Sequence, residues 1–578
     1  MRHVAMRWGL RIGAFALPLV LFWTTFDRFV LAKLLTARLL GLALAALLLA
    51  RVAIGGWPGW RRTPIDLPLL AFIATAALAT VFAVNRNVAV FGSYFRYEGL
   101  ITIALYGALF WLAVQVLREA KDATGLIRSL LASGFLVAAI AILQSVFGWG
   151  LPDPQSCEAL RPFATLGNAI ELAAFLALVL PFAVHEFVVA RSAAYRVVAG
   201  NALLVMGLAL VLTLARSAWI GAALGVGVVL LRERPRWPVW AGLASVFTVV
   251  AVLALAQAGA PGRGALPVGA CVVGRGLTVT APATGSGGVR FHVWRDSLNL
   301  IPRSPLVGFG PDSFGLTYPT VQTGDWEPGD HFDKAHADIL QVAVTQGLLG
   351  VGAYLWLLGA FVLAFWRTRA NRALASLFGG WLAYQATMQL NFSWLPAAAP
   401  FWIFAAAAIV IAAPPPSQAS AAMRPPRRSV RLALAGGSVI LVALIVPFVI
   451  RPFVADAAFY AAVVAAGEGR RDDALRDIAT ARALAPEQSI YAVEAGNLDI
   501  SLGSSRHAAP DWVRARDDYM DAARLGTFNP LAFHYLAVSD LNLGRPREAL
   551  DAARRAVELN RFDAASQAFL AQVSAQQQ

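Results

Sequence analysis

The sequence predicts an all-α membrane protein, in which a bundle of about twelve or thirteen transmembrane helices is followed by a soluble α-solenoid. Of the 578 residues, 58% are hydrophobic and only 14% are charged, a composition that is too apolar for a set of soluble domains. From residue 452 onward the chain instead becomes charged, rich in alanine and periodic at helical spacing. We therefore predict a membrane domain at 1–451 and a helical domain at 452–578.

The predicted spans are stretches of about 20 mostly apolar residues. Between the ninth and the tenth of them lies a long polar segment at 258–345. Met1 leads into an apolar run that has no small-residue cleavage site, so we expect no cleaved signal peptide. The span centres fall near residues 19, 46, 74, 109, 137, 179, 205, 224, 247, 356, 382, 404 and 440.

Clusters of arginine and lysine predict the orientation of the spans. The clusters alternate from loop to loop, which is typical of loops on the cytoplasmic side. The N-terminus is then cytoplasmic, and both the 258–345 segment and the helical domain lie on the outer face. The formal charge of +14 follows from this pattern, so we expect no nucleic-acid partner. The clusters lie at 2–11, 61–62, 118–121, 191–196, 232–236, 367–372 and 424–428.

The loops on the outer side carry isolated arginines, with Arg28 and Lys33 as a minor violation of the rule. An arginine on the side that topology disfavours is a candidate functional charge, and snorkelling at the interface is the alternative. Arginine offers a planar charged fork that suits phosphate oxygens, and a neutral histidine such as His336 can accept a proton from a hydroxyl. These residue types predict transfer from a diphosphate-linked donor to an alcohol. The arginines are Arg96, Arg161, Arg216 and Arg290.

Several alternatives stay open at this point. Cys157 and Cys271 both fall in outer loops, so they form either a disulfide or two unpaired thiols. Arg96 and Glu98 could form a simple ion pair, and His336 could be an ordinary interfacial residue.

An acidic stretch in the polar segment offers hard oxygen ligands that suit Mg or Ca. Its spacing matches no ligand loop, so we expect a solvated acidic loop there. We expect neither a metal nor another cofactor. The stretch contains Asp325, Glu327, Asp330, His331 and Asp333.

Two stretches of the C-terminal domain, at 469–486 and 544–560, are similar to each other. Each has a glycine turn, an acidic residue before Ala-Leu and an apolar stripe at helical spacing, which resembles tetratricopeptide helix pairs. A degenerate middle repeat at 512–525 completes the three repeats that a self-supporting stack needs. We prefer binding of a protein partner as the role of this domain, with a spacer or a dimer contact as alternatives.

Three sequence elements resemble the O-antigen ligase and polymerase superfamily. The stretch 335–341 with the following Gly-Leu-Leu-Gly is similar to the family's histidine signature, and 216–219 to its Ser-Arg-x-x-Trp element. Arg290, Trp294 and the stretch 305–310 resemble its large-loop pattern. The resemblance covers about residues 60–412, and a tetratricopeptide tail also occurs in the family. Two positions depart from the pattern, with Ala215 in place of serine and Ala337 in place of asparagine.

The resemblance implies a GT-C-like membrane fold and an inverting, metal-independent glycosyltransferase of the bacterial inner membrane. Its donor would be an undecaprenyl-diphosphate-linked glycan, and its acceptor a hydroxyl of lipid A-core, a glycan or a protein on the periplasmic side. Arg216 and Arg290 would grip the diphosphate, and His336 would activate or orient the acceptor hydroxyl. Membrane lipid and a protein at the tail would be further partners. The implied substrate-binding residues are Arg96, Arg161, Trp219, Asp338 and Gln341.

A transporter or flippase is the alternative function, because such proteins have a similar number of spans. No convincing repeat relates the two membrane halves, and charges within the spans are few, with Glu171 the main exception. A third hypothesis, a scaffold without catalytic activity, predicts that His336 and Arg216 are dispensable.

Overall fold

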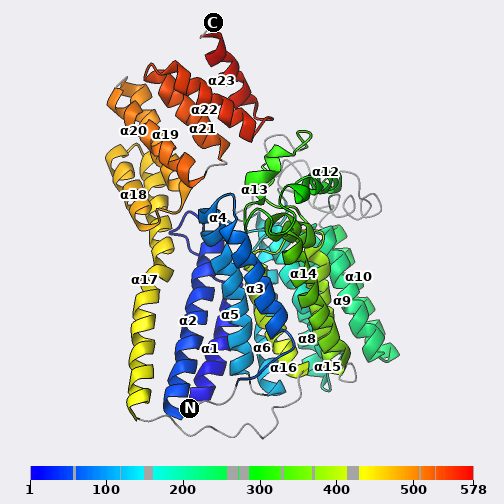
Figure 1. Cartoon of the computed structure of the whole chain (residues 1–578). Coiled ribbons are helices and arrows are strands. Elements are labelled where there is room, and N and C mark those ends of the chain that lie inside the picture. Colours follow the sequence, from blue (N-terminus) through cyan, green and yellow to red (C-terminus); the bar gives the residue numbers. More distant parts are fainter. Residues whose placement is uncertain are drawn as a thin grey trace.

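All regular secondary structure in the part of the chain that the structure describes is helical (Figure 1). The computed structural model describes residues 2–55, 60–117, 119–148, 160–256, 271, 286–326, 331–367, 372–412, 428–506, 509–526 and 529–576. These residues form α-helices and short 3-10 helices and contain no β-strand. The predicted all-α fold class is confirmed.

The lower part of the molecule in Figure 1 is a bundle of roughly parallel helices. Its helices are α1 (Arg2–Ala16), α2 (Val30–Gly55), α3 (Asp66–Val81), α4 (Arg86–Phe91), α5 (Leu100–Val116), α6 (Ala120–Phe147), α7 (Ala169–Val189), α8 (Ala193–Leu212), α9 (Arg216–Glu233), α10 (Trp237–Ala256), α14 (Asp338–Arg367), α15 (Arg372–Met388), α16 (Leu395–Ala412) and α17 (Arg428–Gly467). The short α4 lies at the end of the bundle from which the C-terminal helices project.

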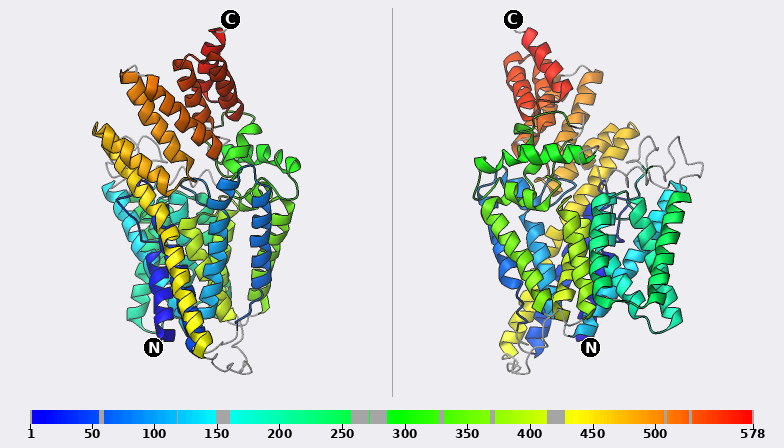
Figure 2. Two further views of the ribbon diagram at one scale, coloured as in Figure 1. Left: turned by 60° about the vertical axis from the view of Figure 1, so that its left-hand side comes forward. Right: turned by 90° about the vertical axis from the view of Figure 1, so that its right-hand side faces the viewer.

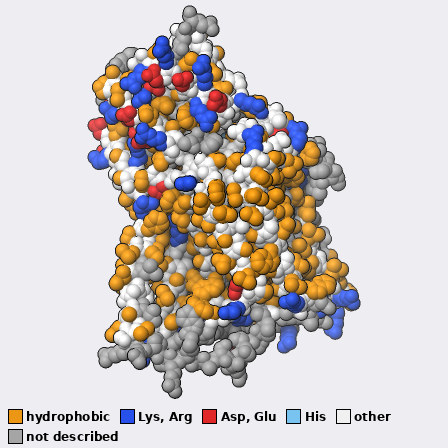
Figure 3. Space-filling view, in the orientation of Figure 1, with side chains coloured by type: hydrophobic (Ala, Val, Ile, Leu, Met, Phe, Trp, Pro, Cys, Tyr) orange, Lys and Arg blue, Asp and Glu red, His pale blue; other side chains and the backbone are white. Residues whose placement is uncertain are grey.

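Seven of the described helices are long and apolar enough to cross a membrane, namely α2, α6, α7, α8, α14, α16 and α17. The helices α3 and α5 are shorter but also apolar. The predicted centres near 224, 247 and 382 fall in α9, α10 and α15, which pack in the same bundle. Hydrophobic side chains cover the side of the bundle in Figure 3, whereas charged side chains gather over the tail and at the lower end. The chain is therefore a multi-pass membrane protein.

The first predicted span, centred near residue 19, does not form a single long helix, and α1 is not among the helices that are long and apolar enough to cross a membrane. Helix α1 ends at Ala16, and the predicted centre near residue 19 falls in an irregular segment. Pro18 explains the difference, because proline disfavours helical backbone at the preceding residue and cannot continue the hydrogen-bond ladder. The violation of the positive-inside rule at Lys33 also has a structural reason, since its ammonium group donates to the carbonyl oxygen of Val20 at 2.9 Å.

Helices α7 and α16 form the core of the bundle, because most of their residues are buried. Figure 2 shows the bundle and the tail from two further sides. Beside α7 and α16, α9 and α15 approach each other closely through glycines. A Cβ at Gly225 would lie 2.3 Å from the carbonyl oxygen of Gly379, and one at Gly221 2.4 Å from that of Ala383. Small residues allow such approach between membrane helices. The contact fixes the start of α9 against the end of α15, where the candidate site lies.

The segment between α10 and α14 folds into a small cap on the bundle. Its elements are α12 (Ser286–Leu298), η2 (Ile301–Arg303), α13 (Phe314–Thr317) and η3 (Tyr318–Thr320), and its core includes Val293, Leu300, Phe314, Tyr318 and Phe332. The predicted polar segment 258–345 ends earlier than expected, because α14 begins at Asp338.

A break in α14 receives the loop of this cap. Gly347 has φ 65° and ψ −168°, a backbone conformation that interrupts the helix. The loop fills the interruption, with the Phe309 N–H donating to the carbonyl of Val344 at 3.0 Å and the Leu348 N–H to that of Pro305 at 2.8 Å. Gly347, the first glycine of the Gly-Leu-Leu-Gly stretch, therefore marks the place where the cap and the bundle form backbone hydrogen bonds with each other.

The C-terminal helices form a tail of stacked pairs. They are α18 (Arg471–Leu484), α19 (Ser489–Arg506), α20 (Ala509–Leu525), α21 (Pro530–Asn542), α22 (Pro546–Leu559) and α23 (Ala564–Ala575). The end of α17 packs on α18, α19 on α20 and α21 on α22, while each pair contacts the next. The predicted turn glycines, Gly469 and Gly544, have φ +76° and +70°. The α-solenoid is confirmed, whereas the domain boundary at residue 451 stays a prediction because α17 runs through it without interruption.

Candidate functional site

A short linker between α15 and α16, Asn391–Trp394, lies at the centre of the candidate site. Each of its four side chains contacts a residue that the sequence analysis singles out or a direct neighbour of one. The linker was not predicted to be functional. It follows α15, whose position against α9 is fixed by the glycine contact described above.

Asn391 joins Arg290 to Ser217, the residue that follows Arg216. A guanidinium N–H of Arg290 on α12 donates to Asn391 Oδ1 at 3.0 Å, and Asn391 Nδ2 donates to the hydroxyl of Ser217. Ser217 follows Arg216 in the first turn of α9, and the Asn391 side chain is fully buried. One amide therefore connects the cap to the start of α9.

Helix α9 begins at Arg216 without a side-chain cap. Ala215 occupies the N-cap position with φ −89° and ψ 89° and makes no capping hydrogen bond. A serine at this position would cap the helix and make it about 1 kcal/mol more stable than alanine does. The first turn of a helix favours anions, because its N–H groups point outward and carry the positive end of the dipole.

His336 lies next to this cluster in an unusual backbone conformation, with φ 53°. Its ring packs edge-on against Phe392, with the ring centroids 5.2 Å apart. Burial lowers the pKa of His336 to about 3, and the positive charge of Arg290 adds to this effect. The imidazole is therefore neutral at pH 7. Among the described residues its buried Nδ1 has no hydrogen-bond partner.

Arg96 forms one wall of the site. It pairs with Asp333 (Nη2 to Oδ1, 3.1 Å), and its guanidinium lies over the Trp394 ring at 4.5 Å from the centroid. The indole N–H of Trp394 donates to the backbone carbonyl of Arg96 at 3.1 Å. The alternative of an Arg96–Glu98 ion pair is wrong, because Glu98 instead accepts a hydrogen bond from the hydroxyl of Tyr106 at 2.7 Å.

Asp338 and Gln341 shape the loop that carries His336. The Asp338 carboxylate accepts hydrogen bonds from the Ser393 backbone N–H (2.7 Å) and hydroxyl (2.6 Å). Gln341 Oε1 accepts the backbone N–H of Ala335 at 2.8 Å. The Ala335 carbonyl in turn accepts the indole N–H of Trp294 at 2.9 Å, which ties the loop to α12.

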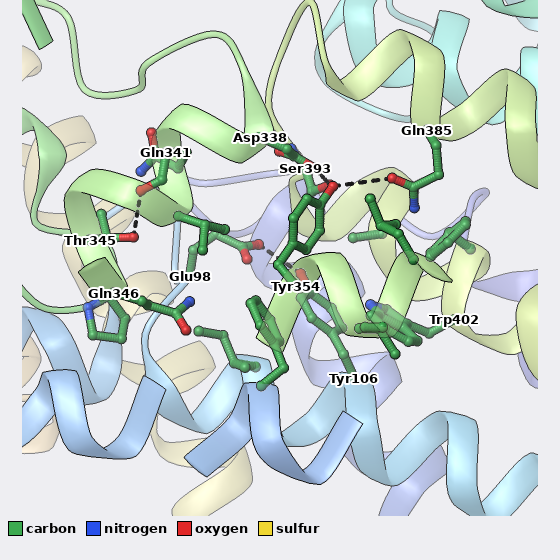
Figure 4. A pocket seen from close by; sticks show the side chains of 18 of the residues that line it. Glu98, Tyr106, Asp338, Gln341, Thr345, Gln346, Tyr354, Gln385, Ser393 and Trp402 are labelled. Atoms are coloured by element: carbon green, nitrogen blue, oxygen red, sulfur yellow. Dashed lines mark hydrogen bonds between the residues drawn. The ribbon is translucent and has the colours of Figure 1, made fainter. Parts of the chain in front are cut away.

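Beneath this loop lies a cavity of about 130 Å³ between α3, α5, α14, α15 and α16 (Figure 4). Its wall combines carboxyl, amide and tyrosine groups with apolar side chains. Asp338 and Gln341 contribute to the wall, but Arg216, Arg290 and His336 do not. The predicted residues therefore divide between this cavity and the arginine cluster. Other lining residues are Glu98, Tyr106, Lys334, Gln346, Tyr354, Gln385, Phe361 and Trp402.

Arg161 and Trp219 both bind backbone carbonyls at the end of α8. Arg161 Nε donates to the carbonyl of Thr213 at 2.7 Å, and the indole N–H of Trp219 donates to that of Leu210 at 2.9 Å. They fix the corner between α8 and α9. A direct role in substrate binding stays a prediction for both.

The predictions on metal and cysteine residues involve some positions that the structure does not describe. Among the described residues, no group of three or more His, Cys, Asp or Glu side chains could hold a metal ion. Glu327 and Asp330 of the acidic stretch lie outside the described residues. Cys271 takes part in a disulfide, and its expected partner Cys157 also lies outside them.

The linker has a weak signal in the sequence. Asn391-Phe392-Ser393-Trp394 places two polar side chains between apolar helices, on the side that charge alternation predicts to be outer. Such a short polar connection is typical of ordinary loops. Its contacts become visible only when the helices are packed.

Comparisons with known proteins relate the chain to one family. A search of curated proteins found no match. Among solved structures, the first tetratricopeptide domain of Spaghetti bound to an HSP90 peptide has 15% identity, covers 22% of this chain and 94% of that chain, and has a TM-score of 0.20. Yeast Tom70 has 10% identity, 82% and 92% coverage and a TM-score of 0.21. At such TM-scores these structures do not bear on the fold. Residues 201–355 match the family model described as O-Antigen ligase, which confirms the predicted resemblance over the segment that contains Arg216, Arg290 and His336.

Proposed function

We propose that the protein is a membrane glycosyltransferase that moves a glycan from an undecaprenyl-diphosphate donor to an acceptor hydroxyl on the periplasmic face of a bacterial inner membrane. The family match over residues 201–355 supports a ligase of this kind. The observation that carries the proposal is that the Asn391 side chain forms hydrogen bonds with both Arg290 and the first turn of α9. The neutral imidazole of His336 lies beside them.

Arg216 and Arg290 bind the donor diphosphate in this proposal. When the bond between the sugar and the diphosphate breaks, negative charge grows on the departing undecaprenyl diphosphate. Guanidinium groups that are already held in place stabilise that charge without reorganisation. Arg290 is held by Asn391, and the α9 N-terminus adds its dipole. Because the protein supplies this positive charge itself, we propose that transfer is independent of metal.

His336 accepts the proton of the acceptor hydroxyl as the hydroxyl oxygen bonds to the sugar. Without donor, burial and the charge of Arg290 keep its pKa at about 3, which makes it a weak base. A bound diphosphate brings negative charge to the same place and offsets the field of Arg290, so the pKa rises. The imidazole is therefore a stronger base when the donor is present than when it is absent. Attack from the face opposite the diphosphate inverts the sugar.

The remaining predicted residues support this reaction. Arg96, held between Asp333 and Trp394, offers a third guanidinium toward the donor. Asp338 and Gln341 hold the His336 loop, and Arg161 and Trp219 hold the start of α9.

Purified, detergent-solubilised protein is expected to transfer glycan from undecaprenyl diphosphate to an acceptor at an undiminished rate in excess EDTA, because arginines neutralise the leaving group. The measurement is product formation with lipid A-core, glycan and protein acceptors in parallel. Loss of transfer in EDTA that Mg²⁺ restores would contradict metal independence. Donor binding without transfer to any acceptor would favour the transporter or flippase.

We also propose that the N-terminus is cytoplasmic and the tail periplasmic, which agrees with their location at opposite ends of the bundle (Figure 1). A cysteine at the exposed position Glu468 in the tail is expected to react with a membrane-impermeant thiol reagent in intact spheroplasts. The matched variant Glu119→Cys, exposed at the other end, is expected to react only after lysis. The reverse pattern would overturn the orientation.

A further inference from the structure

The tail is bonded to the loop that carries Arg96. Asp456, near the end of α17, has a fully buried side chain whose carboxylate serves three parts of the chain. It accepts hydrogen bonds from the backbone N–H of Asp27 at 3.0 Å, from the hydroxyl of Tyr94, and from the hydroxyl of Tyr491 on α19 at 3.5 Å. One carboxylate therefore links the N-terminal segment, the 92–99 loop and the tail.

Aromatic rings surround this carboxylate. The Tyr94 ring lies 6.2 Å from Phe459 and 6.0 Å from Tyr491, and Phe459 lies 5.1 Å from Tyr491, measured between centroids. Rings that exclude water lower the local dielectric, which strengthens the hydrogen bonds to Asp456. The contact between the 92–99 loop and the tail is therefore shielded from water.

The 92–99 loop is held in a conformation that it would not keep unaided. Phe95 and Tyr97 have φ 68° and 54°, in the left-handed region that non-glycine residues rarely adopt. A Cβ at Gly92 would lie 2.4 Å from the Tyr97 backbone, so the loop closes tightly on itself. Outside anchors hold this shape, with Asp312 accepting both the N–H (2.7 Å) and the hydroxyl (2.8 Å) of Ser93. Strained backbone of this kind relaxes when an anchor is lost.

The tail also sits directly on the bundle beside this loop. Asn85 Nδ2, next to α4, donates to the carbonyl of Leu525 at 2.6 Å, and Asn87 Nδ2 donates to that of Glu487. Arg451 on α17 pairs with the Glu487 carboxylate at 2.6 Å. Helix α22 contacts η3 of the cap, so the tail touches both α4 and the cap. A displacement of the tail therefore pulls on the 92–99 loop.

We propose that Tyr94 and Asp456 are positioning residues. They couple the position of the tail on the bundle to the orientation of the Arg96 side chain, so that the tail controls the rate of glycan transfer. This inference rests on the role of Arg96 in the proposed function. Tyr94 lies two residues before Arg96, and the loop between them includes the left-handed Phe95. When Tyr94 is bonded to Asp456, Arg96 is kept between Asp333 and Trp394. When the bond is lost, the loop relaxes and Arg96 loses its orientation, while Arg216 and Arg290 stay in place.

The test compares two phenylalanine variants of the full-length protein in the transfer assay. Tyr94→Phe removes only the hydroxyl that links the Arg96 loop to Asp456. Tyr491→Phe removes a hydroxyl from the same carboxylate, but on the tail side. We expect Tyr94→Phe to lower kcat about tenfold, because misplaced binding groups cost rate. Tyr491→Phe is expected to lower it less than about twofold, because α17 itself, packed on α18, still joins Asp456 to the tail. In an Arg96→Ala background, Tyr94→Phe is expected to have no further effect.

Each outcome decides between a positioning and a purely structural role. Equal losses of kcat in both tyrosine variants, with equal losses of thermal stability, would overturn the inference, since the tail would then only stabilise the fold. An undiminished effect of Tyr94→Phe without Arg96 would also overturn it. Full activity of Arg96→Ala would contradict the role of Arg96 in the proposed function. If the rate of glycan transfer depends on Arg96 but not on Tyr94, this inference is wrong while the proposed function stands.

Discussion

Replacement of Arg290 by alanine is expected to lower the kcat of glycan transfer about a thousandfold, with normal insertion into the membrane. The change removes the guanidinium that stabilises the departing diphosphate and leaves the Asn391 amide without its donor. Arg216→Ala is expected to have a similar effect, because Arg216 sits next to the residue that Asn391 binds on α9. Transfer and donor binding measured on the purified variants check both expectations.

Arg295→Ala is the matched control for Arg290. Arg295 lies on the same helix, but its side chain is half exposed and bonds to Asp296 and Thr323 instead of Asn391. It is expected to transfer glycan at the rate of the unaltered protein. Arg290→Lys keeps the charge without the planar fork, so its rate should lie between those of the native protein and Arg290→Ala. Full activity of both Arg216→Ala and Arg290→Ala would contradict the proposal that these arginines bind the donor diphosphate.

Loss of the His336 imidazole is expected to reduce transfer by about 10²- to 10⁴-fold, the range typical of general acid–base catalysis. Alanine is a poor choice for this test because the backbone at His336 is left-handed, with φ 53°. Asparagine tolerates that conformation, so His336→Asn removes the imidazole while keeping the loop. Donor binding is expected to persist in this variant. Transfer at the native rate would show that His336 has no part in proton transfer.

The same variant has a second readout in the pH dependence of stability. The pKa of His336 is about 3 in the folded protein and near 6.5 as an ordinary value, so between these limits the unfolded chain binds more protons. Stability is therefore expected to fall as the pH decreases from about 6.5 toward 3. His336→Asn should lose this part of the pH dependence, as thermal unfolding at pH 5 and pH 7.5 would measure. An unchanged pH dependence would mean that the imidazole is not kept neutral by its surroundings.

Hydropathy is a local property, and it predicted most of the membrane helices. Its accuracy ends where a single residue interrupts the pattern, as Pro18 does after α1. Arg216, Arg290 and His336 could be found because isolated charges on outer loops are conspicuous. The role of the Asn391–Trp394 linker could not be predicted, because it depends on which residues the linker contacts in the folded protein. Asn391 binds Arg290 from 101 residues away.

The same limit explains the wrong alternative for Arg96. Glu98 is its neighbour in the sequence, but the backbone between them is left-handed at Tyr97. Arg96 instead meets Asp333, 237 residues later in the chain. Pairing over such distances depends on how α9, α14 and α15 pack. The glycine contact of α9 and α15 is visible in the sequence only as isolated glycines.

Helix α17 is a single helix of 40 residues, with Pro447 and Pro452 within it. At 1.5 Å per residue it is about 60 Å long, roughly twice the hydrocarbon thickness of a bilayer. The same rod therefore crosses the membrane and becomes the first helix of the solenoid. Because α17 is continuous, its length sets the height of the solenoid above the lipid surface.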